Sequence, residues 1–106
     1  MADDLVTVTI LPWTSGKLGL GPGRAILTES VVEPDTLGAL LERLADRLPG
    51  FVEWVYDRPE GRVHEHCTIL VNGRAAEGFG GVAAPIAAGD QVTILPGFSG
   101  GAQQAA

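Results

Sequence analysis

A chain of 106 residues has room for one small domain with a single core, which excludes an elaborate internal active site. Hydrophobic residues make up 45% of the chain, which excludes a disordered polypeptide. The 13 acidic residues outnumber the 7 basic ones, and the resulting formal charge of -6 disfavours nucleic acid and anionic membranes as partners.

Two strands and a loop are predicted in the first third of the chain. Valine and isoleucine alternate with threonine from 5 to 11, which is typical of a strand with one face toward a core. Segment 13–23 is rich in glycine and predicts a long, mobile loop. A second strand follows at 24–32, so the two strands form a hairpin.

A leucine stripe predicts the main helix. The stripe recurs at the spacing of one helical face, at Leu37, Leu40, Leu41, Leu44 and Leu48. Asp35-Thr36 offers a side-chain oxygen to the free amides at the helix start, and Pro49-Gly50 ends the helix. Residues 51–56 fit a further helical turn or an extended run, and we expect a short helix there.

A third strand is predicted at 62–71, after the turn-forming residues 57–61. Its alternation puts His64 and His66 on one face and Cys67 on the other. Two histidines are too few ligands for zinc, so we expect solvated histidines, a small buried thiol and no metal site. The single cysteine excludes an internal disulfide.

The last third of the chain predicts a tight turn and a closing strand. Asn72-Gly73 accepts the backbone angles of a hairpin turn, so a short extended segment is expected at 74–77. Segment 77–88 is small and glycine-rich, with Pro85-Ile86 over the core. The apolar alternation at 91–95 predicts the strand that closes the sheet.

Beyond this strand the sequence continues as Pro-Gly-Phe-Ser-Gly-Gly at 96–101. Glycine lets a binding partner close directly on the backbone, so this narrow thread suits insertion into the active site of another protein. The alternative is an ordinary frayed terminus. The order of turn, strand, aromatic residue and diglycine favours the thread.

These segments resemble the ubiquitin-like sulfur carriers, the family of the small molybdopterin synthase subunit and the thiamine sulfur carrier. The most specific match is Gly-Asp-Gln-Val-Thr-Ile-Leu-Pro at 89–96, followed by Gly100 and Gly101. Further matches lie at 9–12, 35–40, 68–73, 79–81 and 85–90. The likeness covers nearly the whole chain up to Gly101, and within the family it is strongest to the bacterial carriers of cysteine biosynthesis.

The resemblance implies an α+β, ubiquitin-like β-grasp fold, with a mixed sheet packed on one main helix and the last strand parallel beside the first. The expected domain spans 1–97, and 98–106 forms a flexible tail. The reacting group is the carboxylate of Gly101, which becomes a thiocarboxylate, and Gly100 supplies reach. Phe98, Leu95 and Ser99 are expected to bind a partner, although Phe98 and Leu95 equally suit a cap over the core.

The resemblance also implies the partners. An E1-like adenylating enzyme uses ATP to activate the carboxylate, and a sulfur donor then supplies sulfur. A PLP-dependent cysteine synthase, or another acceptor enzyme, receives it. The chain itself is a protein cosubstrate rather than an enzyme and binds no cofactor. We expect a cytoplasmic protein, since no signal peptide or long apolar run is present.

One feature departs from the family. The residues Ala-Gln-Gln-Ala-Ala at 102–106 follow the diglycine, whereas the active carriers end at the second glycine. We expect a precursor cut after Gly101, by a zinc metallopeptidase, because a tail of small residues is accessible to proteolysis. The alternatives are a small subunit of molybdopterin synthase, or a ubiquitin-like module that docks or modifies lysine.

Overall fold

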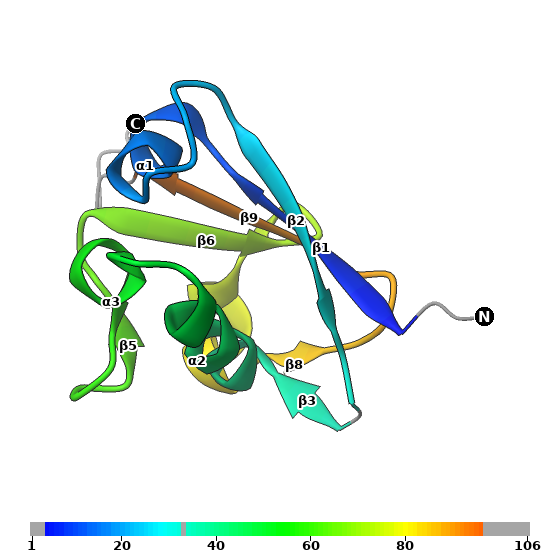
Figure 1. The fold of residues 1–106 in the computed structure, drawn as a ribbon. Helices are drawn as coiled ribbons and strands as arrows, with labels where there is room; N and C mark the ends of the chain where they lie inside the picture. Colours follow the sequence, from blue (N-terminus) through cyan, green and yellow to red (C-terminus); the bar gives the residue numbers. More distant parts are fainter. Residues whose placement is uncertain (1–3, 33, 97–106) are drawn as a thin grey trace.

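A mixed five-stranded sheet forms the centre of the molecule, in the order β2-β1-β9-β6-β7 (Figure 1). The computed structural model describes residues 4–32 and 34–96. The sheet strands are β1 (Leu5–Ile10), β2 (Ala25–Ser30), β6 (Cys67–Val71), β7 (Arg74–Ala75) and β9 (Gln91–Pro96). Helix α2 (Leu37–Arg47) covers one face, so the expected α+β β-grasp arrangement is confirmed. Within the described ranges, no helix is long and apolar enough to cross a membrane.

Helix α2 packs its leucine stripe against the sheet as predicted. The hydroxyl of Thr36 accepts a hydrogen bond from the amide of Ala39 at 3.2 Å, which caps the helix start. Leu37, Leu40, Leu41 and Leu44 are completely buried, and Leu48 is nearly so. Gly50 has a φ of 86°, a left-handed conformation that turns the chain into the predicted short helix, α3 (Phe51–Trp54).

Strand β9 lies in the middle of the sheet, between β1 and β6. It runs parallel to β1, with Val8 beside Val92 and Ile10 beside Ile94. It runs antiparallel to β6, and the two long strands stay in register from Cys67 to Val71. Val92 and Ile94 are buried, so the central, parallel position implied by the family is confirmed.

The loop predicted at 13–23 is wrong over its first half, where helix α1 (Pro12–Lys17) forms. Proline suits the first helical turn because its missing N–H would have no partner there. Ser15 is fully buried, and its hydroxyl lies 3.0 Å from the carbonyl oxygen of Pro12 and 3.3 Å from that of Gly21. These contacts tie the helix to the glycine-rich segment and offset the low helix propensity of Gly16.

The single strand predicted at 62–71 is also wrong. Strand β5 (Arg62–Val63) pairs with β4 (Tyr56–Asp57) in a separate two-stranded sheet, and the central sheet resumes only at Cys67. Between them the chain turns, because the amide of His64 donates to Val55 and the amide of Cys67 donates back to His64.

The region from 72 to 88 follows the prediction in part. Asn72 and Gly73 have positive φ values of 53° and 84° and form the predicted hairpin turn. The extended segment after it is shorter than predicted, since the chain leaves β7 for two short helices, η1 (Ala76–Phe79) and η2 (Gly81–Ala83). Strand β8 (Pro85–Ile86) pairs with β3 (Asp35–Thr36) and buries Ile86 against the core.

We predict that Leu44→Ala lowers the free energy of unfolding by about 2 to 5 kcal/mol, because it empties the centre of the buried stripe. Val32→Ala is the matched control, since the Val32 side chain is 78% exposed, and its cost should stay within about 0.5 kcal/mol. Urea denaturation of the three proteins measures both values. Equal losses in the two variants would contradict the packing described above.

Candidate functional site

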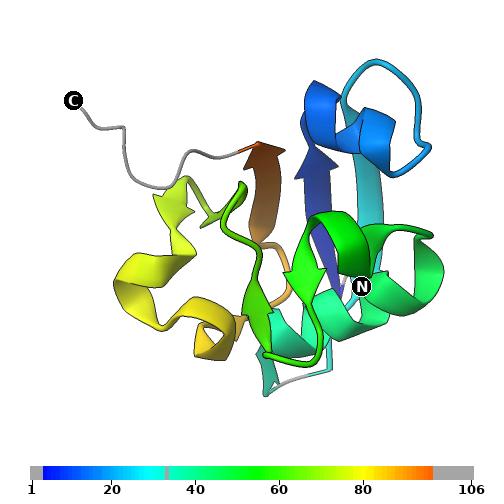
Figure 2. The same ribbon diagram turned by 90° about the vertical axis from the view of Figure 1, so that its left-hand side faces the viewer.

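The candidate site begins where β9 leaves the sheet. The amide of Leu11 donates to the carbonyl oxygen of Ile94 at 2.9 Å on one side, and Pro96 lies opposite Cys67 on the other. Figure 2 shows β9 and β1 pointing the same way, with α1 beside the tip of β1. The chain beyond 96 therefore starts from a strand that is held on both sides. Five residues reach at most about 16 to 18 Å from there.

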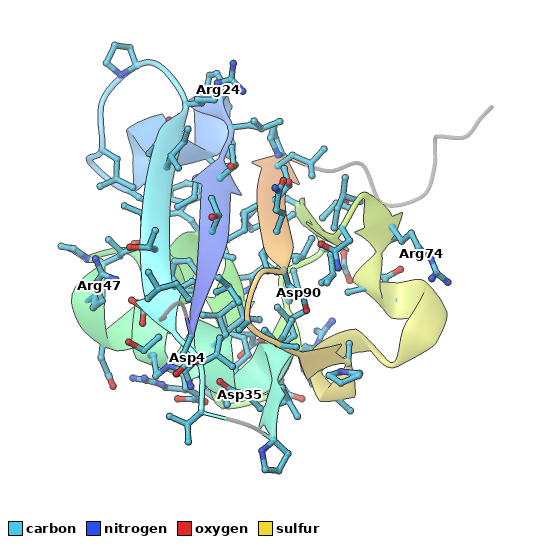
Figure 3. The ribbon with its side chains drawn as sticks, turned by 90° about the vertical axis from the view of Figure 1, so that its right-hand side faces the viewer. Asp4, Arg24, Asp35, Arg47, Arg74 and Asp90 are labelled. Carbon is cyan, nitrogen blue, oxygen red and sulfur yellow. The ribbon has the colours of Figure 1, made fainter. Side chains whose placement is uncertain are left out.

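The side of the sheet opposite α2 is an open face without a charged side chain among the described residues (Figure 3). Its outward residues are Leu5, Thr7 and Thr9 of β1, Ile26, Thr28 and Ser30 of β2, Thr68 and Leu70 of β6, and Gln91, Thr93 and Leu95 of β9. Labelled charges such as Asp4, Arg24 and Asp90 lie at strand ends around it. A face of hydroxyl and aliphatic groups can dock on an uncharged surface without desolvating an ion.

Leu95 belongs to this open face. It lies directly opposite Thr68 and is half-buried, whereas its neighbour Ile94 points into the core and is fully buried. Leu95 is thus available to a partner beside the start of the thread. The other predicted site residues, Phe98, Ser99, Gly100 and Gly101, lie outside the described residues.

The histidines do not follow the predicted strand alternation, because their segment is a turn. Their rings stack at 5.3 Å with an interplanar angle of 9°. Each Nε2 is hydrogen-bonded to a backbone carbonyl of α3, that of His64 to Val52 at 2.7 Å and that of His66 to Trp54 at 2.9 Å. The described ranges contain no group of three or more His, Cys, Asp or Glu side chains that could hold a metal ion.

Cys67 lies beside the start of the thread, but its thiol has low reactivity. Its side chain is buried, as the sequence predicts, and it faces the core from the first residue of β6. Burial raises the pKa of the thiol from 9.0 to about 12, because a thiolate would lose its hydration. Cys67 is therefore protonated at neutral pH and is a poor nucleophile.

The sequence prediction missed an aromatic cluster between α1 and α3. Trp13 and Trp54 meet edge to face at 5.7 Å, and the ring of His66 lies 5.9 Å from that of Trp54. The ammonium group of Lys17 lies over both tryptophan rings. The available signal was the spacing of Trp13 and Lys17, one helical turn apart after Pro12, but the surrounding glycines favoured a loop.

The fold and the position of its last strand define a ubiquitin-like protein of the β-grasp class. The sequence pattern of the ThiS family matches residues 24–101, which include both Gly100 and Gly101. The chain belongs to the ThiS family.

Relatives in sequence and structure agree with this membership. Sulfur carrier protein CysO of Mycobacterium tuberculosis is 41% identical over 68 residues, which are 63% of this chain and 73% of the relative. The crystal structure of Mycobacterium tuberculosis CysO, described as an antigen, superposes with a TM-score of 0.67 at 33% identity, over 88% of this chain and 99% of that one. A chain of the Amycolatopsis orientalis BexX/CysO complex has a TM-score of 0.67 at 24% identity, over 91% and 99%, and shows the shared fold alone.

We predict that Cys67 reacts slowly with a thiol reagent in the folded protein. At pH 8 its thiolate fraction is on the order of a thousandfold lower than in the unfolded chain, since the pKa changes from 9.0 to about 12. Absorbance with an aromatic disulfide reagent, with and without urea, measures the two rates. A native rate within about tenfold of the denatured rate would show that the thiol is accessible.

Proposed function

We propose that this chain is a sulfur carrier that is activated as a C-terminal thiocarboxylate on Gly101, after removal of residues 102–106. The observation that carries the proposal is the match to the ThiS family, which runs through the diglycine and stops at 101. The relatives that are 41% identical bear the name of sulfur carrier, which supports the same function.

The chemistry follows from the poor reactivity of a carboxylate. An E1-like adenylating enzyme joins the Gly101 carboxylate to the AMP portion of ATP and releases pyrophosphate. Sulfide supplied by a sulfur donor then attacks the acyl carbon, the bond to the phosphate oxygen breaks, and AMP leaves. The thiocarboxylate that results passes its sulfur to an acceptor enzyme, such as a PLP-dependent cysteine synthase. The chain is thus a protein cosubstrate, and ATP is bound by its partner.

Each part of the chain has its own role in this proposal. The domain, 1–97, is recognised through the open face, and the tail, 98–106, contains the reacting group. Gly100 and Gly101 lack side chains, so the walls of a narrow active site can close on their backbone. Leu95, Phe98 and Ser99 contact the partner beside the entrance. A zinc metallopeptidase removes 102–106, because a chain that continues past Gly101 presents no carboxylate there.

We predict that the full-length chain accepts no sulfur from an adenylating enzyme, ATP and a sulfur donor, whereas a chain ending at Gly101 does. Intact mass should show one exchange of oxygen for sulfur in the shorter chain alone. A chain ending at Gly100 is the matched control and should fail, because its carboxylate falls about 3.3 to 3.6 Å short of the reaction centre.

Other outcomes of this experiment favour the other functions. Sulfur uptake by the full-length chain would contradict the proposal that this chain is a precursor. A lysine adduct of the shortened chain, rather than a thiocarboxylate, would favour a ubiquitin-like modifier. A thiocarboxylate that transfers sulfur only to the large subunit of molybdopterin synthase would assign the chain to that enzyme.

We also predict that Leu95→Ala lowers kcat/KM for adenylation of the shortened chain by about tenfold, and that Leu95→Glu lowers it further. A glutamate would place a charge on the open face where the partner docks. Val32→Glu is the matched control, because Val32 is exposed outside the sheet. Pyrophosphate release measures the rates, and thermal melting checks the fold. Equal rates for the Leu95 and Val32 variants would exclude Leu95 from the docking surface.

A further inference from the structure

The basic residues of this chain are almost all arginines. Lys17 is the only lysine among 106 residues, and the other basic side chains are six arginines. A guanidinium group stays protonated in proteins and does not attack an acyl carbon, whereas a lysine amine does so once it has lost its proton. Lys17 is therefore the only side-chain amine that an activated carboxyl group could acylate.

Lys17 is held over two aromatic rings. Its Nζ lies 5.4 Å from the centroid of the Trp13 ring and 4.9 Å from that of the Trp54 ring. Both distances are within the range of a cation–π attraction, which acts on the charged ammonium group. To attack an acyl carbon, the amine must lose this charge and leave both ring faces.

The rest of the cluster fixes the two rings. They meet at 86°, and the His66 ring, which is tied to the backbone of α3, contacts both of them. Gly50 starts α3 from a left-handed φ of 86°, and a Cβ atom there would lie at ordinary contact distance from α1 and α3, 3.6 Å from the carbonyl oxygen of Lys17 and 3.5 Å from the Trp54 ring. The clamp is thus assembled from α1, α3 and the turn before β6.

We propose that Trp13 and Trp54 form an aromatic clamp that makes Lys17 a restrained acylation site, the one side chain at which activated carboxyl termini of other copies can form an amide. This inference rests on the proposed activation of Gly101. In the side reaction, the neutral amine of Lys17 attacks the acyl-adenylate carbon, a C–N bond forms, the C–O bond to AMP breaks, and one proton is released. The product is an amide cross-link whose carboxyl group can no longer take up sulfur, and the clamp slows its formation.

The test uses acetylation of the full-length chain by N-hydroxysuccinimidyl acetate, which requires no carrier activity. The variant Arg24→Lys supplies an internal reference, because Arg24 is exposed and makes none of these ring contacts among the described residues. Peptide mapping by mass spectrometry then compares two lysines in one molecule. We expect the lysine introduced at position 24 to be acetylated about three- to tenfold faster than Lys17.

Removing the rings should abolish this difference. Trp54→Leu and Trp13→Leu in the Arg24→Lys chain should raise the rate at Lys17 toward that of the reference lysine, while Trp54→Phe keeps a ring and should give an intermediate rate. Circular dichroism checks that each variant is folded. Equal rates in the parent chain, or a slow Lys17 that is unaffected by Trp54→Phe and by both leucine variants, would overturn the clamp.

A second arm connects the clamp to activation. The chain ending at Gly101, with its adenylating enzyme and ATP but no sulfur donor, should form more cross-linked dimer through Lys17 in the Trp13→Leu and Trp54→Leu variants than in the parent. The Lys17→Arg substitution should remove this product. A chain that is never adenylated contradicts the proposed function but leaves the acetylation result intact, whereas equal acetylation rates contradict the clamp alone.

Discussion

The pairing of β9 on both of its edges is the constraint on which the rest of the structure depends. Parallel pairing with β1 and antiparallel pairing with β6 place this strand at the centre of the sheet. Two of its own side chains, Val92 and Ile94, are buried in the core, and burial of each stabilises the fold by about 1.5 to 3 kcal/mol. The end of β9 at Pro96 therefore has a fixed position in the sheet, which a thread entering a partner requires.

Helix α2 covers one face of the central sheet, and the opposite face stays available to a partner. Helix α2 buries its leucines on the inner face, and its arginines reach the edge strand β2, where Arg43 donates to the carbonyl of Ser30 and Arg47 to that of Thr28. These bonds occupy carbonyls that an edge strand would otherwise offer to another chain. The protein thus limits association through the edge strand β2, while the uncharged open face of the sheet stays exposed.

Local sequence patterns predicted the elements whose stability is local. The leucine spacing and the cap at Thr36 predicted α2, and Asn72-Gly73 predicted the hairpin turn between β6 and β7. Helix α1 was missed because it depends on buried contacts of Ser15 with distant carbonyls. The break before Cys67 was missed because the amide of His64 pairs with Val55, outside the central sheet. The central place of β9 came from the family resemblance, since alternation alone does not select a neighbour.

The cysteine thiol and the lysine amine of this chain are both restrained as nucleophiles. The only cysteine is buried and protonated, and the only lysine lies over two tryptophan rings. A chain whose carboxyl terminus becomes an acyl-adenylate is exposed to attack by the amines and thiols of its own copies. Restraint of both groups is therefore what a sulfur carrier needs if its activated terminus is to wait for the sulfur donor.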